Sequence, residues 1–261
     1  MKFSRKTLGI PYSVFLILFV VLPLVVLFFY AFTNGQGHFT FANLAGFFTD
    51  PNALGTLIYS FAIAAVTTIV CLLLAYPTAY ILAMSSLKSK SVIVMIFVMP
   101  MWINFSLRIT AMKEILTFLE GNLSMYPFLN SVIGMTYDFL PFMILPIYTT
   151  ISRLDGALRE AAMDLGADER STFLSVTLPL SVPGIISGVS MVFLPAMTNY
   201  VVLDMLNNST YIMGSLIGSY FAAYNWHAGS MIALILLGLI CLFTLLSGSG
   251  EEDNQRGGAL L

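Results

Sequence analysis

Charged side chains are scarce in this sequence, and no polar stretch is long enough to form a water-soluble domain. Only 9% of the 261 residues are charged, whereas 58% are hydrophobic. The mean hydropathy is +0.90. This composition is typical of polytopic membrane proteins. The net charge of −2 gives no sign of a nucleic-acid partner.

The residues and motifs of catalysis are also scarce. The two cysteines, Cys71 and Cys241, fall inside apolar blocks and are expected to be buried thiols. The two histidines, His38 and His227, lie in separate loops without the spacing of a metal site. The sequence has no Gly-x-x-x-x-Gly-Lys-Ser/Thr nucleotide loop and no evident Ser, His and Asp arrangement. We therefore predict no enzyme, no metal and no cofactor in this chain, so that any uphill transport needs energy from another chain.

Six apolar blocks predict an all-α protein with six transmembrane helices. The predicted spans are about 11–32, 54–84, 91–109, 131–151, 183–206 and 229–246. They form one membrane domain, 11–246, between an N-terminal segment, 1–10, and a polar tail, 247–261, which is expected to be flexible. At 1.5 Å per residue the second block reaches roughly 46 Å, more than the ~30 Å hydrocarbon core, so Pro77 is expected to kink it. A short helix is predicted between the last two spans.

The positive charges lie mostly on one side of this topology. With the N-terminus inside, the inner segments hold Lys2, Arg5, Lys6, Lys88, Lys90, Arg153, Arg159, Arg170 and Arg256. Only Arg108 and Lys113 fall outside. The positive-inside rule therefore predicts that both termini are cytosolic, as is the loop 152–180.

That loop is the longest charged passage between the apolar blocks. Small and apolar residues from Ala157 to Leu165 follow helical spacing, and Gly166 stands where a helix commonly ends. A second short helix is expected from Asp168, and Leu178-Pro179 is expected to end it, because proline disfavours helix at the preceding residue. The loop thus predicts two short helices at the membrane surface.

The sequence EAAMDLGADERSTFLSVTLP, 160–179, resembles the EAA loop of bacterial ABC-importer permeases. The matching residues are Glu160, Ala161, Ala162, Gly166, Leu178 and Pro179; Val176 stands where isoleucine is usual. The resemblance implies the type I importer permease (MetI-like) fold. It also implies three partners: a second permease subunit, expected to form a heterodimer; a cytosolic ATPase dimer that holds ATP and Mg²⁺; and an extracytoplasmic solute-binding protein.

The resemblance also implies a role for each residue of the loop. Arg159, Glu160 and Asp164 would meet the ATPase through charged contacts. Ala161 and Ala162 would allow close approach, and Gly166 would permit the turn. A rigid short helix seated in a groove transmits rigid-body motion to the spans on either side.

Further segments resemble the B-type permease of spermidine/putrescine importers. They are PMWINFSLRI at 100–109, YDFLPFMILPIY at 137–148 and LPAMTNYVVLDML at 194–206. A polyamine is a flexible polycation, so its path should offer carboxylates and aromatic faces. The candidate pathway residues are Trp102, Asn104, Tyr137, Asp138 and Asp204. Arg108 would repel such a cargo and is interpreted as an outer-interface residue or a salt-bridge partner.

The sequence leaves three alternatives open. An ABC permease for ferric iron, thiamine or an oxyanion would share the loop; an anion importer should lack Asp138 and Asp204. A self-sufficient secondary transporter or channel should show internal repeats, and none is evident. A membrane scaffold would tolerate substitution of Glu160. The favoured prediction is an importer permease in the bacterial inner membrane.

Overall fold

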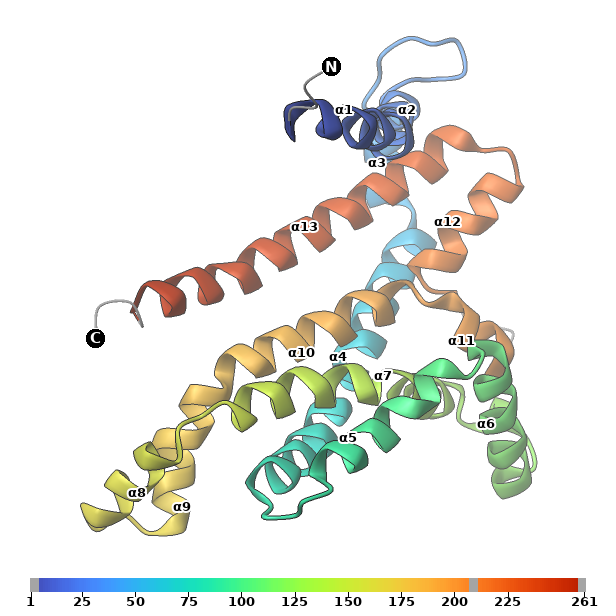
Figure 1. Cartoon of the computed structure of the whole chain (residues 1–261). Helices are drawn as coiled ribbons and strands as arrows, with labels where there is room; N and C mark the ends of the chain where they lie inside the picture. The colour runs from blue at the N-terminus through green and yellow to red at the C-terminus, as the bar shows by residue number, and fades with distance from the viewer. Residues whose placement is uncertain (1–4, 207–210, 258–261) are drawn as a thin grey trace. The chain divides into compact units, whose positions relative to one another are not determined.

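The computed structural model describes residues 5–206 and 211–257, and most of them lie in helices (Figure 1). The contacts divide the chain into two compact units, which are described separately. The first comprises Met1–Leu57 and Met213–Cys241, and the second comprises Ile58–Ile212 and Leu242–Leu261. Within the described ranges, the one β interaction is an isolated bridge between Thr33 and Phe39.

The first unit contains the N-terminal span. Its helices are α1 (Arg5–Leu16), a π-helical turn (Ile17–Val21), α2 (Leu22–Ala31), α3 (Ala42–Thr49), α12 (Met213–Ala222) and the first half of α13 (Trp226–Gly257). A tight loop follows α2, where the Asn43 side-chain amide donates to the carbonyls of Ala31 and Thr33. Helix α12 is the short helix predicted between the last two spans.

The second unit holds the other long helices. They are α4 (Pro51–Met84, which starts in the first unit), α5 (Lys90–Val98), a 3₁₀ turn (Met99–Trp102), α6 (Phe105–Glu120), a 3₁₀ turn (Leu123–Met125) and α7 (Pro127–Ser152). They continue with α8 (Gly156–Asp164), α9 (Glu169–Thr172), a π-helical turn (Phe173–Thr177), α10 (Leu178–Thr198) and α11 (Tyr200–Leu206).

Helix α7 forms the core of this unit. Met143, Ile144 and Ile147 on its inner face are fully buried. Helix α10 packs along α7 (Figure 1) because glycines let the two backbones approach. A Cβ built on Gly184 would lie 2.6 Å from Thr150 Oγ1, and one on Gly188 would lie 2.7 Å from Met143 Sδ. The spacing of the two glycines, four residues apart, is typical of close helix packing.

The helices cover the predicted spans with some differences. In the described part of the chain, five helices are long and apolar enough to cross a membrane, or six if the bent pair formed by Lys90–Trp102 and Phe105–Glu120 is one span. Helix α4 continues through Pro77 as one helix of 34 residues. Helix α10 ends at Thr198, and α11 restarts at Tyr200 inside the predicted fifth span.

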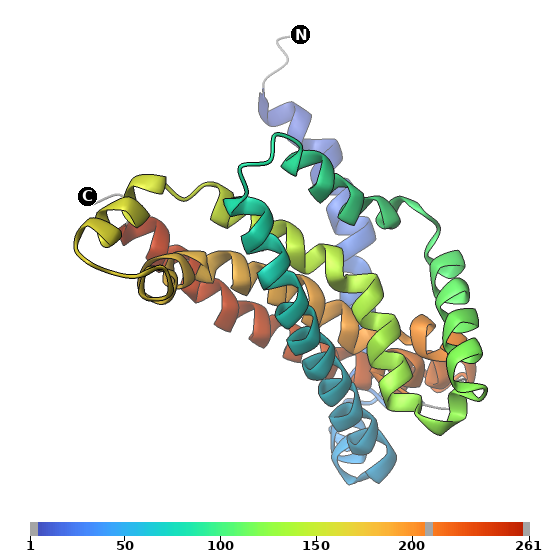
Figure 2. The same cartoon turned by 90° about the horizontal axis from the view of Figure 1, so that it is seen from below.

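The predicted third span, 91–109, is not one straight helix. Its two halves are bent by 96° (Figures 1 and 2). Pro100 lies in the 3₁₀ turn at the end of the first half. Asn104 leaves helical geometry, and its side-chain oxygen accepts the Ser106 N–H at 2.9 Å, which caps the start of α6. The proline and the cap together stop one helix and start the next.

Two smaller expectations differ from the structure. The backbone of the tail predicted to be flexible, 247–261, is helical as far as Gly257 because α13 continues without a proline to end it; 258–261 lie outside the described residues. Cys71 is buried, as expected, but Cys241 is exposed on α13.

Candidate functional site

Helices α8 and α9, with the turn between them, form the helical knob predicted for the charged loop. Asp155 Oδ1 caps α8 by accepting the Ala157 N–H at 3.0 Å, and Asp168 Oδ1 caps α9 by accepting the Ser171 N–H at 2.9 Å. Gly166 ends α8 with φ +90°, a left-handed conformation that favours glycine. Its N–H donates to the Met163 carbonyl, as expected of a Schellman turn.

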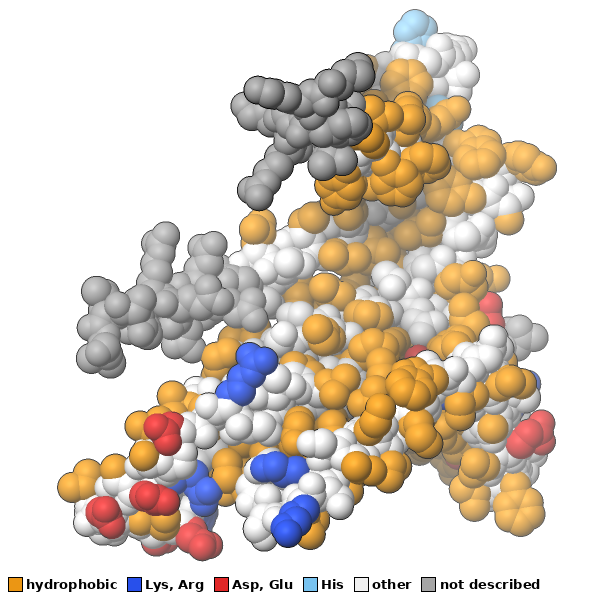
Figure 3. Space-filling model, viewed as in Figure 1, with side chains coloured by type: hydrophobic (Ala, Val, Ile, Leu, Met, Phe, Trp, Pro, Cys, Tyr) orange, Lys and Arg blue, Asp and Glu red, His pale blue; other side chains and the backbone are white. Residues whose placement is uncertain are grey.

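One face of the knob is exposed. Helix α8 has no buried residue, and Glu160, Ala161 and Asp164 are exposed while Ala162 is half-buried. Leu165 is 90% exposed. In the space-filling view, acidic side chains gather at the end of the second unit formed by α8 and α9 (Figure 3). Leu158 and Met163 of α8 are also exposed, by 48% and 41%, and a group of exposed apolar side chains beside carboxylates is typical of a protein–protein contact surface.

Arg159 does not share this exposure. It is half-buried, and its Nη1 donates to the sulfur of Met84, 2.8 Å away at the end of α4. The charged contact between Arg159 and an ATPase stays a prediction, and the structure adds a contact within the chain. The cause of the difference in exposure is helical geometry, because successive residues point in different directions and Glu160 takes the outward one.

The second short helix does not end at Leu178-Pro179, contrary to the prediction. The chain is helical from Glu169 to Thr198. The π-helical turn Phe173–Thr177 comes directly before Leu178, whose N–H bonds the Phe173 carbonyl five residues back. The wider turn relieves the crowding that proline causes in an α-helix. The same arrangement occurs at the turn Ile17–Val21, which precedes Leu22-Pro23.

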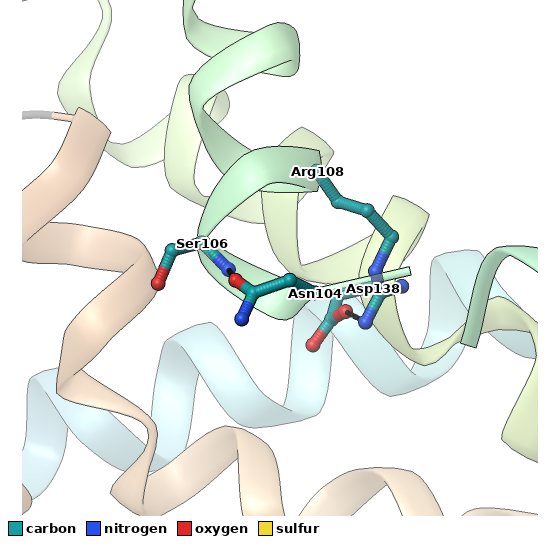
Figure 4. A network of polar contacts seen from close by, with 4 residues as sticks. All are labelled: Asn104, Ser106, Arg108 and Asp138. Atoms are coloured by element: carbon teal, nitrogen blue, oxygen red, sulfur yellow. Dashed lines mark hydrogen bonds and ion pairs between the residues drawn. The ribbon is translucent and has the colours of Figure 1, made fainter. Parts of the chain in front are cut away.

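Asp138 was predicted to line the cargo path in the fourth span. Its carboxylate forms a salt bridge with Arg108. The distance from Arg108 Nη2 to Asp138 Oδ1 is 2.6 Å, and the two side chains are 7% and 5% exposed (Figure 4). Asp138 thus has a charged partner inside the chain. Arg108 is a salt-bridge partner, one of its two predicted roles, but it is buried and not at an outer interface. The bend before α6 brings Arg108 against α7.

The other predicted pathway residues lie on the surface of the chain. Trp102 is 73% exposed, Tyr137 is 38% exposed, and Asn104 and Asp204 are exposed as well. Asn104 also caps α6, which gives it a structural role. The structure thus separates these exposed candidates from the buried Asp138.

The described residues contain no group of three or more His, Cys, Asp or Glu side chains that could hold a metal ion. His227 instead lies with its Nδ1 3.0 Å from the carbonyl oxygen of Tyr30.

Comparison with known proteins shows which family the chain belongs to. No family model matches the sequence. It is 34% identical over 267 residues to the spermidine/putrescine transport system permease protein PotB of Haemophilus influenzae, with 94% of this chain and 92% of that protein covered. It is 33% identical to PotB of Escherichia coli strain K12, with 74% of this chain and 77% of that protein covered. The chain belongs to the PotB family of permeases.

Membership of the PotB family confirms the resemblance found in the sequence. The relatives are named as transport permease proteins, in agreement with the prediction of a transport subunit that is not an enzyme. A bacterial alginate ABC transporter, solved in complex with an alginate pentasaccharide-bound periplasmic protein, shares the fold. That match has a TM-score of 0.74 at 11% identity and covers 93% of this chain and 91% of the other. The all-α, ABC-importer permease fold is therefore established, and the protein is a multi-pass membrane protein.

The sequence analysis missed the residues that join the knob of this permease to α4. Tyr76 OH lies 2.9 Å from Ser181 Oγ on α10. The Phe173 ring meets Tyr76 and Tyr80 edge to face, with centroids 6.0 and 5.2 Å apart. The sequence pattern that could have revealed these residues is the spacing of the two tyrosines, which are four residues apart on one helix face beside the alanines Ala75 and Ala79.

Proposed function

We propose that this permease forms half of the translocation pathway of an ATP-driven importer of spermidine or putrescine. ATP and Mg²⁺ bind to a separate ATPase dimer, and a solute-binding protein delivers the cargo. The partner across the pathway is a second, different permease subunit. The names of the PotB relatives support the cargo. The alginate transporter of the same fold, solved with its periplasmic protein, supports delivery by a binding protein.

The observation that carries the coupling part is the uncovered face of α8. Glu160 is exposed there, and Leu165 is 90% exposed beside it. Exposed apolar side chains next to charge suit insertion into a groove on a partner. The small side chains of Ala161 and Ala162 allow a partner to approach that face closely. Gly166 turns the chain back toward the membrane. The positive side chains around this knob support a place for it, and for both termini, in the cytosol beneath the bacterial inner membrane.

The cargo path in this proposal follows the exposed surface of the permease. Trp102 and Tyr137 offer aromatic faces to an ammonium group, and Asp204 offers a carboxylate. Asp138 supports this path only indirectly, because its charge is neutralised by Arg108. The path is completed by the second permease.

The test is to reconstitute the complex in liposomes and to measure uptake and binding-protein-stimulated ATP hydrolysis. Spermidine, putrescine, ferric iron, thiamine and sulfate are offered in turn. The proposal expects stimulation by a polyamine and none by sulfate. Stimulation by another of these solutes alone would keep the importer and replace the cargo, and hydrolysis that no added solute stimulates would overturn the proposal.

A further inference from the structure

One face of the last turns of α4 contacts the knob and the segment that follows it at three successive positions. Tyr76, Tyr80 and Met84 are spaced four residues apart, so they form a single stripe along the helix. All three side chains are half-buried. The contacting residues are 75 to 105 positions apart in sequence, so chain connectivity does not enforce these contacts.

Each residue of the stripe reaches a different part of the knob and of the helix that follows. Met84 Sδ accepts from Arg159 Nη1 of α8 at 2.8 Å. Tyr80 meets the ring of Phe173, the first residue of the π-helical turn, with centroids 5.2 Å apart and planes at 80°. Tyr76 meets the same ring and also bonds Ser181 on α10.

The neighbouring positions allow the stripe to make these contacts. Ala75, Ala79 and Ala83 form a parallel stripe of small, buried side chains one position before it. Small side chains let a helix approach its neighbours closely. Beside the contacts lies an open groove of about 760 Å³, lined by the two tyrosines, Phe173 and the start of α9. The knob is thus held to α4 along one edge, and the rest of the surface stays open.

The position of Phe173 indicates that these contacts can transmit movement. The π-helical turn is the joint between α9 and α10, and such turns are less regular than the helices that they interrupt. A push on the knob would be partly absorbed at this joint if the backbone were the only connection. Phe173 is the first residue of this joint and Ser181 lies beyond it on α10, and Tyr76 contacts both.

We propose that Tyr76, Tyr80 and Met84 form a strut that transmits movement of the knob to α4. The knob then drives α4 together with α7 and α10, the two helices that flank it in the chain. The three residues are positioning residues, because they act through the knob and do not touch cargo or nucleotide. The inference rests on the proposed function and adds a route for its coupling step.

The test compares three variants in the reconstituted complex by the number of cargo molecules moved per ATP hydrolysed. Tyr80→Leu removes the ring contact and should lower this ratio about five-fold while ATP hydrolysis stays within about two-fold of wild type. Tyr80→Phe keeps the ring and should behave as wild type. Tyr76→Phe removes only the hydroxyl that meets Ser181 and should lower the ratio about two-fold.

The outcomes separate the strut from simple packing. If the Leu and Phe variants at position 80 give the same ratio, the strut is wrong. If Tyr80→Leu prevents co-purification with the ATPase, Tyr76→Phe decides, since it removes one oxygen atom and no ring; an unchanged ratio there overturns the strut. Failure of the proposed function looks different, because wild type itself would then show no polyamine-dependent hydrolysis.

Discussion

Arg108 and Asp138 form a buried ion pair between α6 and α7, with Nη2 and Oδ1 2.6 Å apart. Arg108 Nε and Nη1 have no hydrogen-bond partner among the described residues, so the carboxylate provides the main compensation for the guanidinium charge. The pair fixes α6, which follows the bend in the third span, against α7. Each charge is tolerated because of the other.

Removing one member of this pair should destabilise the permease far more than removing both. Arg108→Gln or Asp138→Asn alone leaves an unpaired buried group, and each should cost about 3–5 kcal/mol in the free energy of unfolding. The double variant should recover most of that loss. Thermal denaturation in detergent measures the three variants, and strictly additive losses would show that the two residues are not coupled.

Asp204 should affect cargo affinity without this effect on stability. It is exposed on α11, and Asp204→Asn removes one carboxylate from the proposed path. Loss of about 1 kcal/mol of attraction for an ammonium group corresponds to a KM about five-fold higher for polyamine uptake. Uptake by the reconstituted complex at graded concentrations measures KM. An unchanged KM with normal assembly removes Asp204 from the path.

The packing of α10 on α7 should depend on Gly184. A Cβ there would lie 2.9 Å from the Pro146 carbonyl oxygen, which belongs to the backbone and cannot move aside easily. Gly184→Ala should therefore cost about 1–3 kcal/mol in stability. Gly238→Ala on α13, with nothing within 4 Å of its Cβ, is the matched control and should be neutral or slightly stabilising. Equal melting temperatures for the two variants would contradict the packing described.

The turn of the knob should depend on Gly166. Its φ of +90° is one that L side chains rarely adopt, although a Cβ would have open space around it. Gly166→Ala should strain the turn by about 1–2 kcal/mol and weaken co-purification with the ATPase. Gly156→Ala, at the start of α8 with ordinary φ and open space, should leave co-purification intact. If both variants co-purify like wild type, the turn geometry does not matter for docking.

The sequence predicted those features that depend on local chemistry. Hydrophobic blocks predicted the long helices, and Gly166 and the caps Asp155 and Asp168 lie where helix ends are expected. The importer-permease family and the knob were predicted from a motif of fixed spacing, and the polyamine branch was predicted from the resemblance of segments 100–109, 137–148 and 194–206.

Features that depend on tertiary contacts could not be predicted in this way. The partner of Asp138 is 30 residues away in sequence, and only the 96° bend at Asn104 brings Arg108 to it. Nothing in the sequence indicates that α4 ends beside Arg159, so its contact with Met84 was missed. Pro179 predicted a helix end, but the π-helical turn before it accommodates the ring. A pattern along one helix does not show which residues a distant helix contacts.

The central claim is that the knob lies in the cytosol and is covered by an ATPase. Labelling of a Leu165→Cys variant in a Cys241→Ser background tests both the location of the knob and its covering by the ATPase. Position 165 is 90% exposed, and the remaining cysteine, Cys71, is buried. A membrane-impermeant maleimide should label inside-out vesicles and not right-side-out ones, and bound ATPase should lower the labelling at least five-fold. Labelling from the outer side, or labelling that the ATPase does not change, would contradict the account.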